Sequence, residues 1–190
     1  AGAPAGGFQS GDELLANGTW DVILGDPSCY VSSPDTCLPT DPLMRESVAV
    51  RSGANPVTGD ALVTSSSPIA NPINGHEWDI ANKDDLQYAC IFPLTVARDC
   101  AAVESCACND PNNDNPLCYD QGLGSFTQTQ FRAKGYPGIR ELSVLKSIQT
   151  QGIVASICPA QTDDQVSKDY GYRPAVGAIV ERLKLALGGQ

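Results

Sequence analysis

One loop of this chain carries the residues whose types and spacing best suit a metal site. Asp110, Asn112 and Asp114 follow the D-x-N-x-D order of a calcium-binding loop, in which oxygens at positions 1, 3 and 5 contact the ion. The twelfth position holds Gln121 instead of the usual bidentate glutamate, so Asp120 is the candidate substitute. The loop therefore predicts calcium, and no other cofactor, bound by Asp110, Asn112, Asp114 and Asp120. A plain Asn/Asp/Pro turn is the alternative interpretation.

His76 is the one histidine of the sequence, so Ser–His–Asp hydrolysis would have to use it. No G-x-S-x-G elbow is present, and His76-Glu77 does not continue as the H-E-x-x-H motif of a zinc protease. We therefore expect an imidazole that is hydrogen-bonded within a turn and packed near Trp78. An extracytoplasmic hydrolase that uses acidic residues or His76 is kept as an alternative function.

A further candidate ligand is Asp26, which follows the apolar run of residues 19–24 in the sequence Gly25-Asp26-Pro27. An apolar run that ends in this way is typical of a strand of an α/β sheet whose carboxyl end opens into a loop. Ligands bind at such strand ends, which makes Asp26 a candidate binding residue. The alternative is an aspartate that caps a turn before proline.

Eight cysteines in 190 residues indicate where the chain works. A zinc site would need paired C-x2-C knuckles or Cys/His sets, whereas Cys106-Ala-Cys108 is a C-x-C, and no C-x-x-C-H haem motif occurs. We expect disulfides, and hence an extracytoplasmic location: the periplasm, the cell surface or the medium. By proximity, Cys29–Cys37 would close a Pro-rich loop, and Cys118 would pair with Cys106 or Cys108. The expected disulfide cysteines are Cys29, Cys37, Cys90, Cys100, Cys106, Cys108, Cys118 and Cys158.

Composition limits the remaining function classes. Hydrophobic residues make up 42% of the chain and charged residues 18%, which is enough apolar material to bury a core. The chain has 12 Lys and Arg against 22 Asp and Glu, a net charge of −10, so nucleic-acid phosphates and anionic lipids would be repelled. No apolar stretch reaches the roughly 18 residues of a membrane helix, so we expect a chain that does not span a membrane.

Periodic apolar residues predict the elements that would position these side chains. The spacing of apolar residues over 139–148 indicates an amphipathic helix, and the β-prone run of residues 153–157 indicates a buried strand. Pro174 is well placed as the first residue of a second amphipathic helix, which extends to Leu187 before a Gly-Gly stop. Shorter elements are predicted as well: a helical turn at residues 12–16, a strand at 19–24, and a strand or buried turn within 84–94.

A helix–strand–loop–helix order is typical of a βα layer, which predicts the fold class. We expect an α/β fold with a small, mainly parallel sheet, flanking helices and long disulfide-stapled loops. Residues 1–18 are predicted to be an irregular leader, and residues 19–190 a single domain. Long loop insertions are predicted at 27–80 and 99–130, where turn-forming residues are frequent.

Three segments of the C-terminal third are similar to a known family. Tyr136-Pro-Gly-Ile-Arg-Glu-Leu, Gly152-Ile-Val-Ala-Ser-Ile-Cys158 and the final helix resemble the last helix–strand–helix of secreted bacterial proteins related to von Willebrand factor type A domains, mainly over residues 136–187. The family's Asp-x-Ser-x-Ser metal-site loop is absent from the chain, so no metal ligand is carried over. Either the fold is only locally similar, or the other half belongs to a precursor. The second case implies a partner polypeptide that completes the sheet.

These observations favour a non-catalytic, disulfide-stabilised binding or structural module outside the cytoplasm. Large loops on a small sheet offer a broad polar surface, which suits protein recognition better than a buried small-molecule pocket. We expect another protein chain or subunit as the partner, within a larger envelope or surface assembly, with calcium as the candidate stabiliser. A redox or electron-transfer accessory protein that uses cysteine metal ligands is a further alternative.

Overall fold

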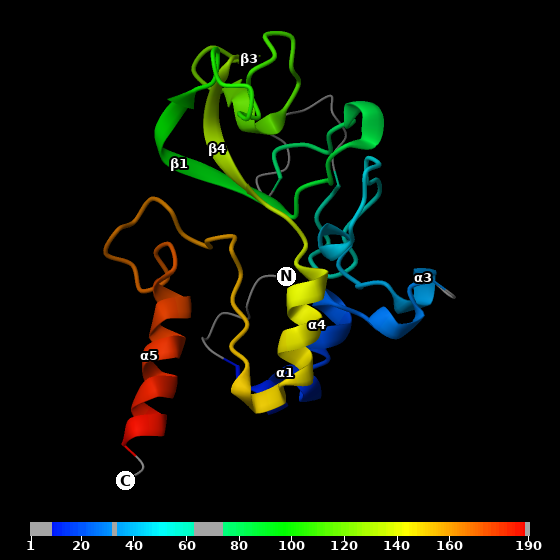
Figure 1. Ribbon diagram of the computed structural model, residues 1–190, viewed down its shortest axis with the longest axis vertical. Coiled ribbons are helices and arrows are strands. Elements are labelled where there is room, and N and C mark those ends of the chain that lie inside the picture. The colour runs from blue at the N-terminus through cyan, green and yellow to red at the C-terminus, as the bar shows by residue number, and fades with distance from the viewer. Residues whose placement is uncertain (1–8, 32–33, 63–73, 189–190) are drawn as a thin grey trace. The chain divides into compact units, whose positions relative to one another are not determined.

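The computed structural model describes three stretches of the chain: residues 9–31, 34–62 and 74–188. The chain divides into two compact units (Figure 1), of which the first combines Ala1–Asp41 with Gly138–Gln190 and the second is Pro42–Pro137. This boundary falls inside the single domain expected over residues 19–190. The loop insertion expected at 27–80 extends from the first unit into the second, whereas the one expected at 99–130 lies within the second.

The described part of the first unit is helical. Its α-helices are α1 (Gly11–Ala16), α2 (Thr19–Ile23), α3 (Pro34–Cys37), α4 (Ile139–Ser147) and α5 (Arg173–Leu187). α1, α2 and α4 pack together around the buried side chains of Trp20, Leu24 and Ile139 (Figure 1). Ser10 caps α1, because its hydroxyl accepts from the Glu13 N–H (3.2 Å) while the Glu13 carboxylate accepts from the Ser10 N–H (2.7 Å). The three helical elements predicted for this unit are confirmed.

Both strands predicted for the first unit are wrong. Residues 19–24 form α2 and its C-cap, because Trp20 and Leu24 lie one helical turn apart and bury the same face, with 5% and 0% of their surface exposed. Residues 153–157 form no strand. A strand needs a neighbouring strand for its backbone hydrogen bonds, and the described residues of this unit contain none.

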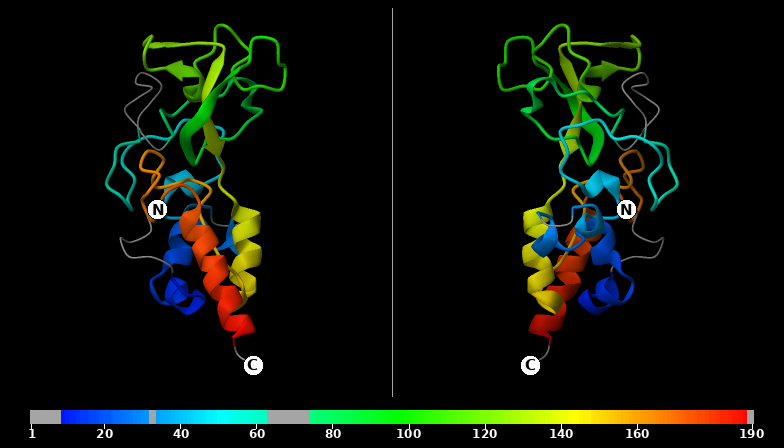
Figure 2. Two further views of the ribbon diagram at one scale, coloured as in Figure 1. Left: turned by 90° about the vertical axis from the view of Figure 1, so that its left-hand side faces the viewer. Right: turned by 90° about the vertical axis from the view of Figure 1, so that its right-hand side faces the viewer.

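The second unit contains the described strands, in two antiparallel pairs: β1 (Cys90–Asp99) with β4 (Thr129–Gly135), and β2 (Tyr119–Asp120) with β3 (Ser125–Phe126). In the longer pair, which Figure 2 shows from two sides, Cys90 lies opposite Gly135 and Asp99 lies opposite Thr129. The chain therefore mixes helices and strands as expected, but the predicted mainly parallel sheet is wrong. A parallel sheet needs crossover connections between its strands, and the two runs expected to supply such strands did not form.

The expected disulfides are confirmed. The structure pairs Cys29–Cys37 in the first unit, and Cys100–Cys106 and Cys108–Cys118 in the second. Of the two partners considered for Cys118, the structure therefore selects Cys108. Cys90 and Cys158 are disulfide-bonded as well, so none of the eight cysteines, all of which are described, is free. Complete oxidation of this kind indicates an oxidising, extracytoplasmic environment.

Disulfide sulfurs also form much of the core of the second unit. Tyr88 and Ile91, at the beginning of β1, are buried against them together with Leu117 from the segment Pro116–Cys118. The strand predicted within residues 84–94 is confirmed in the first half of β1, whose side chains change from buried to exposed along the strand. The remaining short turns are the 3₁₀ segments η1 (Pro27–Cys29), η2 (Pro42–Met44), η3 (Ala81–Lys83), η4 (Pro116–Cys118) and η5 (Gln149–Gln151). Of the helices that the structure describes, none combines the length and hydropathy of a membrane span.

Candidate functional site

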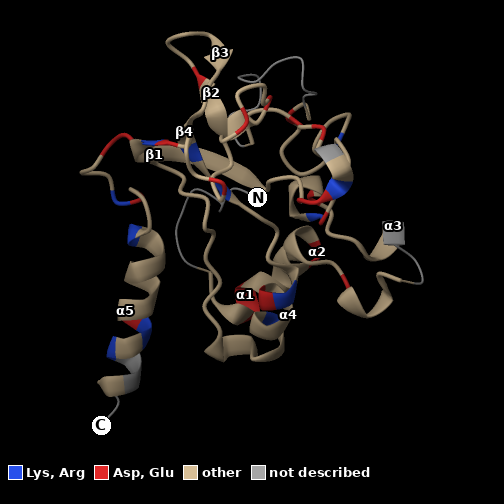
Figure 3. Cartoon of the chain, turned by 45° about the horizontal axis from the view of Figure 1, so that its top comes forward, with Lys and Arg blue, Asp and Glu red and all other residues tan. Residues whose placement is uncertain are grey.

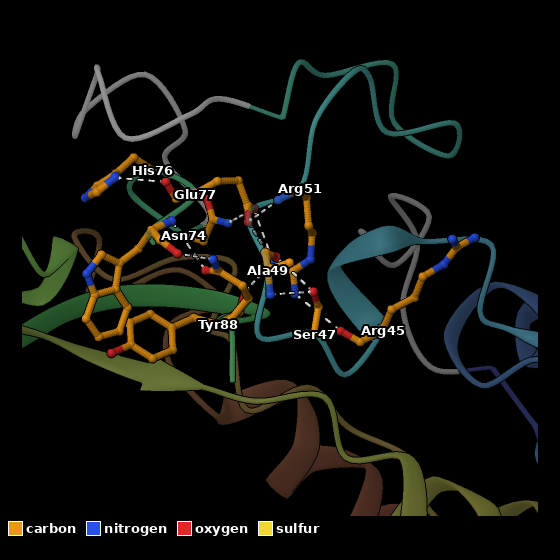
Figure 4. A network of polar contacts seen from close by, with 10 residues as sticks. Arg45, Ser47, Ala49, Arg51, Asn74, His76, Glu77 and Tyr88 are labelled. Atoms are coloured by element: carbon orange, nitrogen blue, oxygen red, sulfur yellow. Dashed lines mark hydrogen bonds and ion pairs between the residues drawn. The ribbon is translucent and has the colours of Figure 1, made fainter. Parts of the chain in front are cut away.

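A buried ion pair joins two distant loops of the second unit (Figure 4). The Arg51 Nη1 atom lies 3.1 Å from the Glu77 Oε1 atom, and the two side chains are 6% and 0% exposed. The Glu77 carboxylate also accepts from the Arg51 backbone N–H (3.3 Å) and from the Asn74 Nδ2 atom (2.5 Å). The guanidinium in turn donates to the backbone carbonyls of Tyr88 (3.1 Å) and Arg45 (3.4 Å). These hydrogen bonds join the segments around Arg45, Arg51, Glu77 and Tyr88, so this Arg51–Glu77 cluster ties loops together.

His76 lies beside this cluster and is 1% exposed. Its Nε2 atom is 2.9 Å from the backbone oxygen of Asp114, and its Nδ1 atom is 3.2 Å from the backbone oxygen of Glu77. The imidazole is hydrogen-bonded as expected, and its ring centroid lies 6.1 Å from that of Phe126. Packing of His76 near Trp78 stays a prediction. Both ring nitrogens face backbone carbonyls, and within the described residues no hydroxyl is hydrogen-bonded to His76, so the geometry suits a link between two loops.

Three of the four predicted calcium ligands accept hydrogen bonds from the protein through one carboxylate oxygen each. The Asp110 Oδ1 atom accepts from the Asn112 N–H (2.8 Å), as in a plain turn. The Asp114 Oδ1 atom accepts from the indole Nε1 of Trp78 (2.6 Å), and the Asp120 Oδ1 atom accepts from the Gly122 N–H (2.7 Å). Within residues 9–31, 34–62 and 74–188, no three acidic, histidine or cysteine side chains gather as a metal site. Calcium in this loop stays a prediction.

Asp26 caps a turn, which was the alternative to a ligand at a strand end. Its Oδ1 atom accepts from the Ser28 hydroxyl (2.7 Å) and from the Ser28 N–H (3.0 Å) at the start of η1. These hydrogen bonds, the hydroxyl first, lower the pKa of Asp26 because they stabilise its carboxylate. The preceding residues form α2 and not a strand, so the reason for expecting a ligand at Asp26 no longer applies.

A second cluster of polar side chains in the second unit was not indicated by any sequence motif. The Lys134 amino group lies 3.0 Å from the Asp85 Oδ2 atom and about equally far, 5.0 and 4.9 Å, from the ring centroids of Tyr88 and Tyr136. The Tyr136 hydroxyl donates to the Asp85 Oδ1 atom at 2.6 Å. Burial alone would raise the pKa of Asp85, but the hydrogen bonds from Tyr136 and Lys134 outweigh it and lower that pKa. These four residues, the Lys134 cluster, join β4 to the segment before β1.

Helix α5 of the first unit carries a run of exposed apolar side chains. Its stripe of apolar residues has the spacing that predicted the helix, but it faces solvent instead of a sheet. Arg173, Glu181, Arg182 and Lys184 provide both signs of charge on the same helix, with basic residues in the majority (Figure 3). We call this stripe the α5 apolar face; its members, with their exposed fractions, are Val176 (57%), Ile179 (48%), Val180 (42%), Leu183 (53%) and Leu187 (76%).

Comparison with known proteins adds no relative, because no family model, no curated protein and no solved structure matches this chain. The resemblance of residues 136–187 to von Willebrand factor type A domains therefore stays a prediction. Function has to be argued from the geometry of the chain itself. The polar groups described above are hydrogen-bonded or ion-paired within the protein, whereas the side chains of the α5 apolar face are exposed.

Proposed function

We propose that this chain is a non-catalytic binding or structural module of a larger assembly outside the cytoplasm. The observation that carries the proposal is the α5 apolar face, which exposes five aliphatic side chains on one side of a single helix. A contiguous apolar surface of this kind is unfavourable in water and marks sites of protein–protein contact. The disulfides support a location in the periplasm, at the cell surface or in the medium.

The partner that fits this face is another protein chain. Its complementary surface would be apolar at the centre and acidic at the rim, because Arg173, Arg182 and Lys184 outnumber Glu181 on α5. An acidic rim gives specificity and faster association more than affinity, whereas burial of the aliphatic side chains gives the affinity. A module that attaches in this way needs no catalytic group of its own.

The alternative functions have less support in the geometry. A hydrolase based on His76 would need a nucleophile within hydrogen-bonding distance of the imidazole, and the ring nitrogens face the backbone oxygens of Glu77 and Asp114 instead. A redox or electron-transfer accessory would need thiolates as metal ligands. All eight cysteines are in disulfides, so no thiolate is available in this structure.

The proposal is tested by the size of the native complex that contains the chain. We expect the natural source to yield the chain in a complex larger than 20.0 kDa, from which Leu183→Glu is lost. Leu123→Glu is the matched control, because it makes the same change at an exposed leucine of the second unit (71% exposed) and should stay in the complex. Both variants should keep the melting temperature of the wild type, since both side chains are exposed. Isolation of the native chain as a free monomer would overturn the proposal.

A further inference from the structure

A β-prone segment of the first unit lacks backbone hydrogen bonds. None of the N–H groups of residues 153–157 donates to another residue in the described part of the chain. Of their carbonyls, only that of Ile157 accepts, from the Tyr172 hydroxyl at 3.0 Å. Val154 packs partly buried against the Trp20 cluster, whereas Ala155 is exposed and Ile157 is 55% exposed. The segment is therefore held by the Val154 side chain and by the bond from Tyr172, and its backbone pairs with no strand among the described residues.

Helix α5 runs antiparallel to this segment. At one end, Tyr172 before α5 donates to the carbonyl of Ile157, and at the other end Arg182 donates to the carbonyl of Thr150, which precedes the segment. Helix α5 and the segment of residues 153–157 are thus joined by a hydrogen bond near each end. An amphipathic helix antiparallel to an apolar extended segment is the arrangement of one layer of an α/β sheet, in which neighbouring strands normally cover the helix face.

We infer that residues 153–157 pair with a β-strand supplied by a partner chain, and that this strand also covers the α5 apolar face. This inference rests on the proposed function and names the surface and the partner. The occupant is a strand because the unmet groups are backbone N–H and C=O groups, which only an extended chain can pair in register. Its side chains toward α5 must be aliphatic to match Val180 and Leu183.

A second copy of this chain is a poorer occupant than a different chain. Each copy carries a net charge of −10, so two copies repel each other before any contact is made. A different chain can add contacts beyond the strand, and it can combine an acidic rim opposite α5 with a smaller net negative charge than this chain carries.

Hydrogen exchange of the isolated chain gives the first test. The amides of residues 153–157 should exchange at close to unprotected rates, whereas the paired amides of β1 and β4 should be protected by a factor of about a hundred or more. In the native complex, exchange of residues 153–157 should slow by about ten-fold or more. Protection of these amides in the isolated chain would overturn the inference, because the segment would then already be paired.

Photo-crosslinking in the native source identifies the occupant. With p-benzoylphenylalanine at Ala155 or at Val180, we expect crosslinks to the same extended, aliphatic segment of one different protein. Val96 in the second unit, which is 78% exposed, is the control position and should not crosslink to that segment. Crosslinks to a second copy of this chain, or to unrelated segments from the two positions, would overturn the inference.

Proline substitution separates this inference from the proposed function. Ala155→Pro removes a backbone N–H at an exposed position and should weaken assembly by about ten-fold or more, whereas Ala155→Ser should not. If assembly withstands Ala155→Pro but is lost in Leu183→Glu, strand pairing is wrong and the binding module stands. If the chain joins no assembly at all, both are wrong. Circular dichroism and non-reducing mass analysis confirm that each variant is folded and oxidised.

Discussion

Removal of the Glu77 carboxylate tests how far the second unit depends on its buried ion pair. In Glu77→Gln the side chain keeps its size, but Arg51 remains charged, with only 6% of its side chain exposed and no counter-charge. Loss of one partner of a buried pair costs roughly 3–5 kcal/mol of unfolding free energy. Because Glu77 accepts from the Arg51 side chain, the Arg51 backbone and Asn74, we expect a loss near the middle of this range, about 4 kcal/mol.

Urea denaturation without a reductant measures this loss. With a slope of about 2 kcal/mol/M, a loss of 4 kcal/mol lowers the transition midpoint by about 2 M. Asp85→Asn is the matched control. The Lys134 and Asp85 side chains are 29% and 32% exposed, so water can replace the hydrogen bonds that the substitution removes. That variant should lose about 1 kcal/mol or less.

A Glu77→Gln midpoint within about 0.5 M of the wild type would refute the reasoning, because such a small shift corresponds to an ion pair that is exposed to solvent. The double variant Arg51→Met/Glu77→Leu distinguishes charge from shape. Since apolar residues of similar volume often replace a buried pair at little cost, it should recover most of the stability. A double variant as weak as Glu77→Gln would show that the hydrogen bonds of Arg51 to the Tyr88 and Arg45 carbonyls hold the loops.

Three further predictions concern the second unit. Replacing both Cys108 and Cys118 by Ala should lower the unfolding free energy by about 2–5 kcal/mol, measured by urea denaturation; a loss below about 1 kcal/mol would contradict a role for this disulfide in the core. Because the pKa of Asp85 is lowered in the folded state, its contribution to stability is complete above its ordinary pKa of 3.8 and is lost as the pH falls below that value. The melting temperature of the wild type should therefore approach that of Asp85→Asn on acidification, and a constant difference down to pH 2 would contradict this. If calcium binds the predicted loop beside the Asp114–Trp78 hydrogen bond, millimolar chelator should lower the melting temperature and change tryptophan fluorescence; unchanged values would exclude calcium at this loop.

Local sequence patterns predicted the elements whose stabilising contacts lie within a few residues. The apolar spacing over 139–148 and the proline at position 174 each correspond to a helix in the structure, α4 and α5. The same reasoning failed at residues 19–24, because a six-residue apolar run fits both a strand and two turns of helix. Burial of Trp20 and Leu24 on the same side decided for the helix, and that burial depends on Ile139, which is distant in sequence.

The candidate sites depended on distant contacts even more strongly. Arg51 and Glu77 are 26 residues apart, and Asp85 and Lys134 are 49 residues apart, so no motif or spacing joins them. His76 was singled out because it is the one histidine, but its type did not reveal that both ring nitrogens face backbone carbonyls. A charged residue inside an otherwise turn-rich loop, such as Arg51, was the one available signal of a buried pair.

The amino-acid sequence by itself determined the helices with strong periodicity, the acidic charge and the oxidised state of the cysteines, because these follow from the types of residues and their local spacing. Only the tertiary structure decided that the sheets are antiparallel, that the charged side chains of Arg51 and Glu77 are buried together, and that residues 153–157 pair with no strand among the described residues. A strand is stable only when another strand pairs with its backbone, and a charge is buried only when a distant partner meets it. Both conditions depend on contacts between residues far apart in the chain.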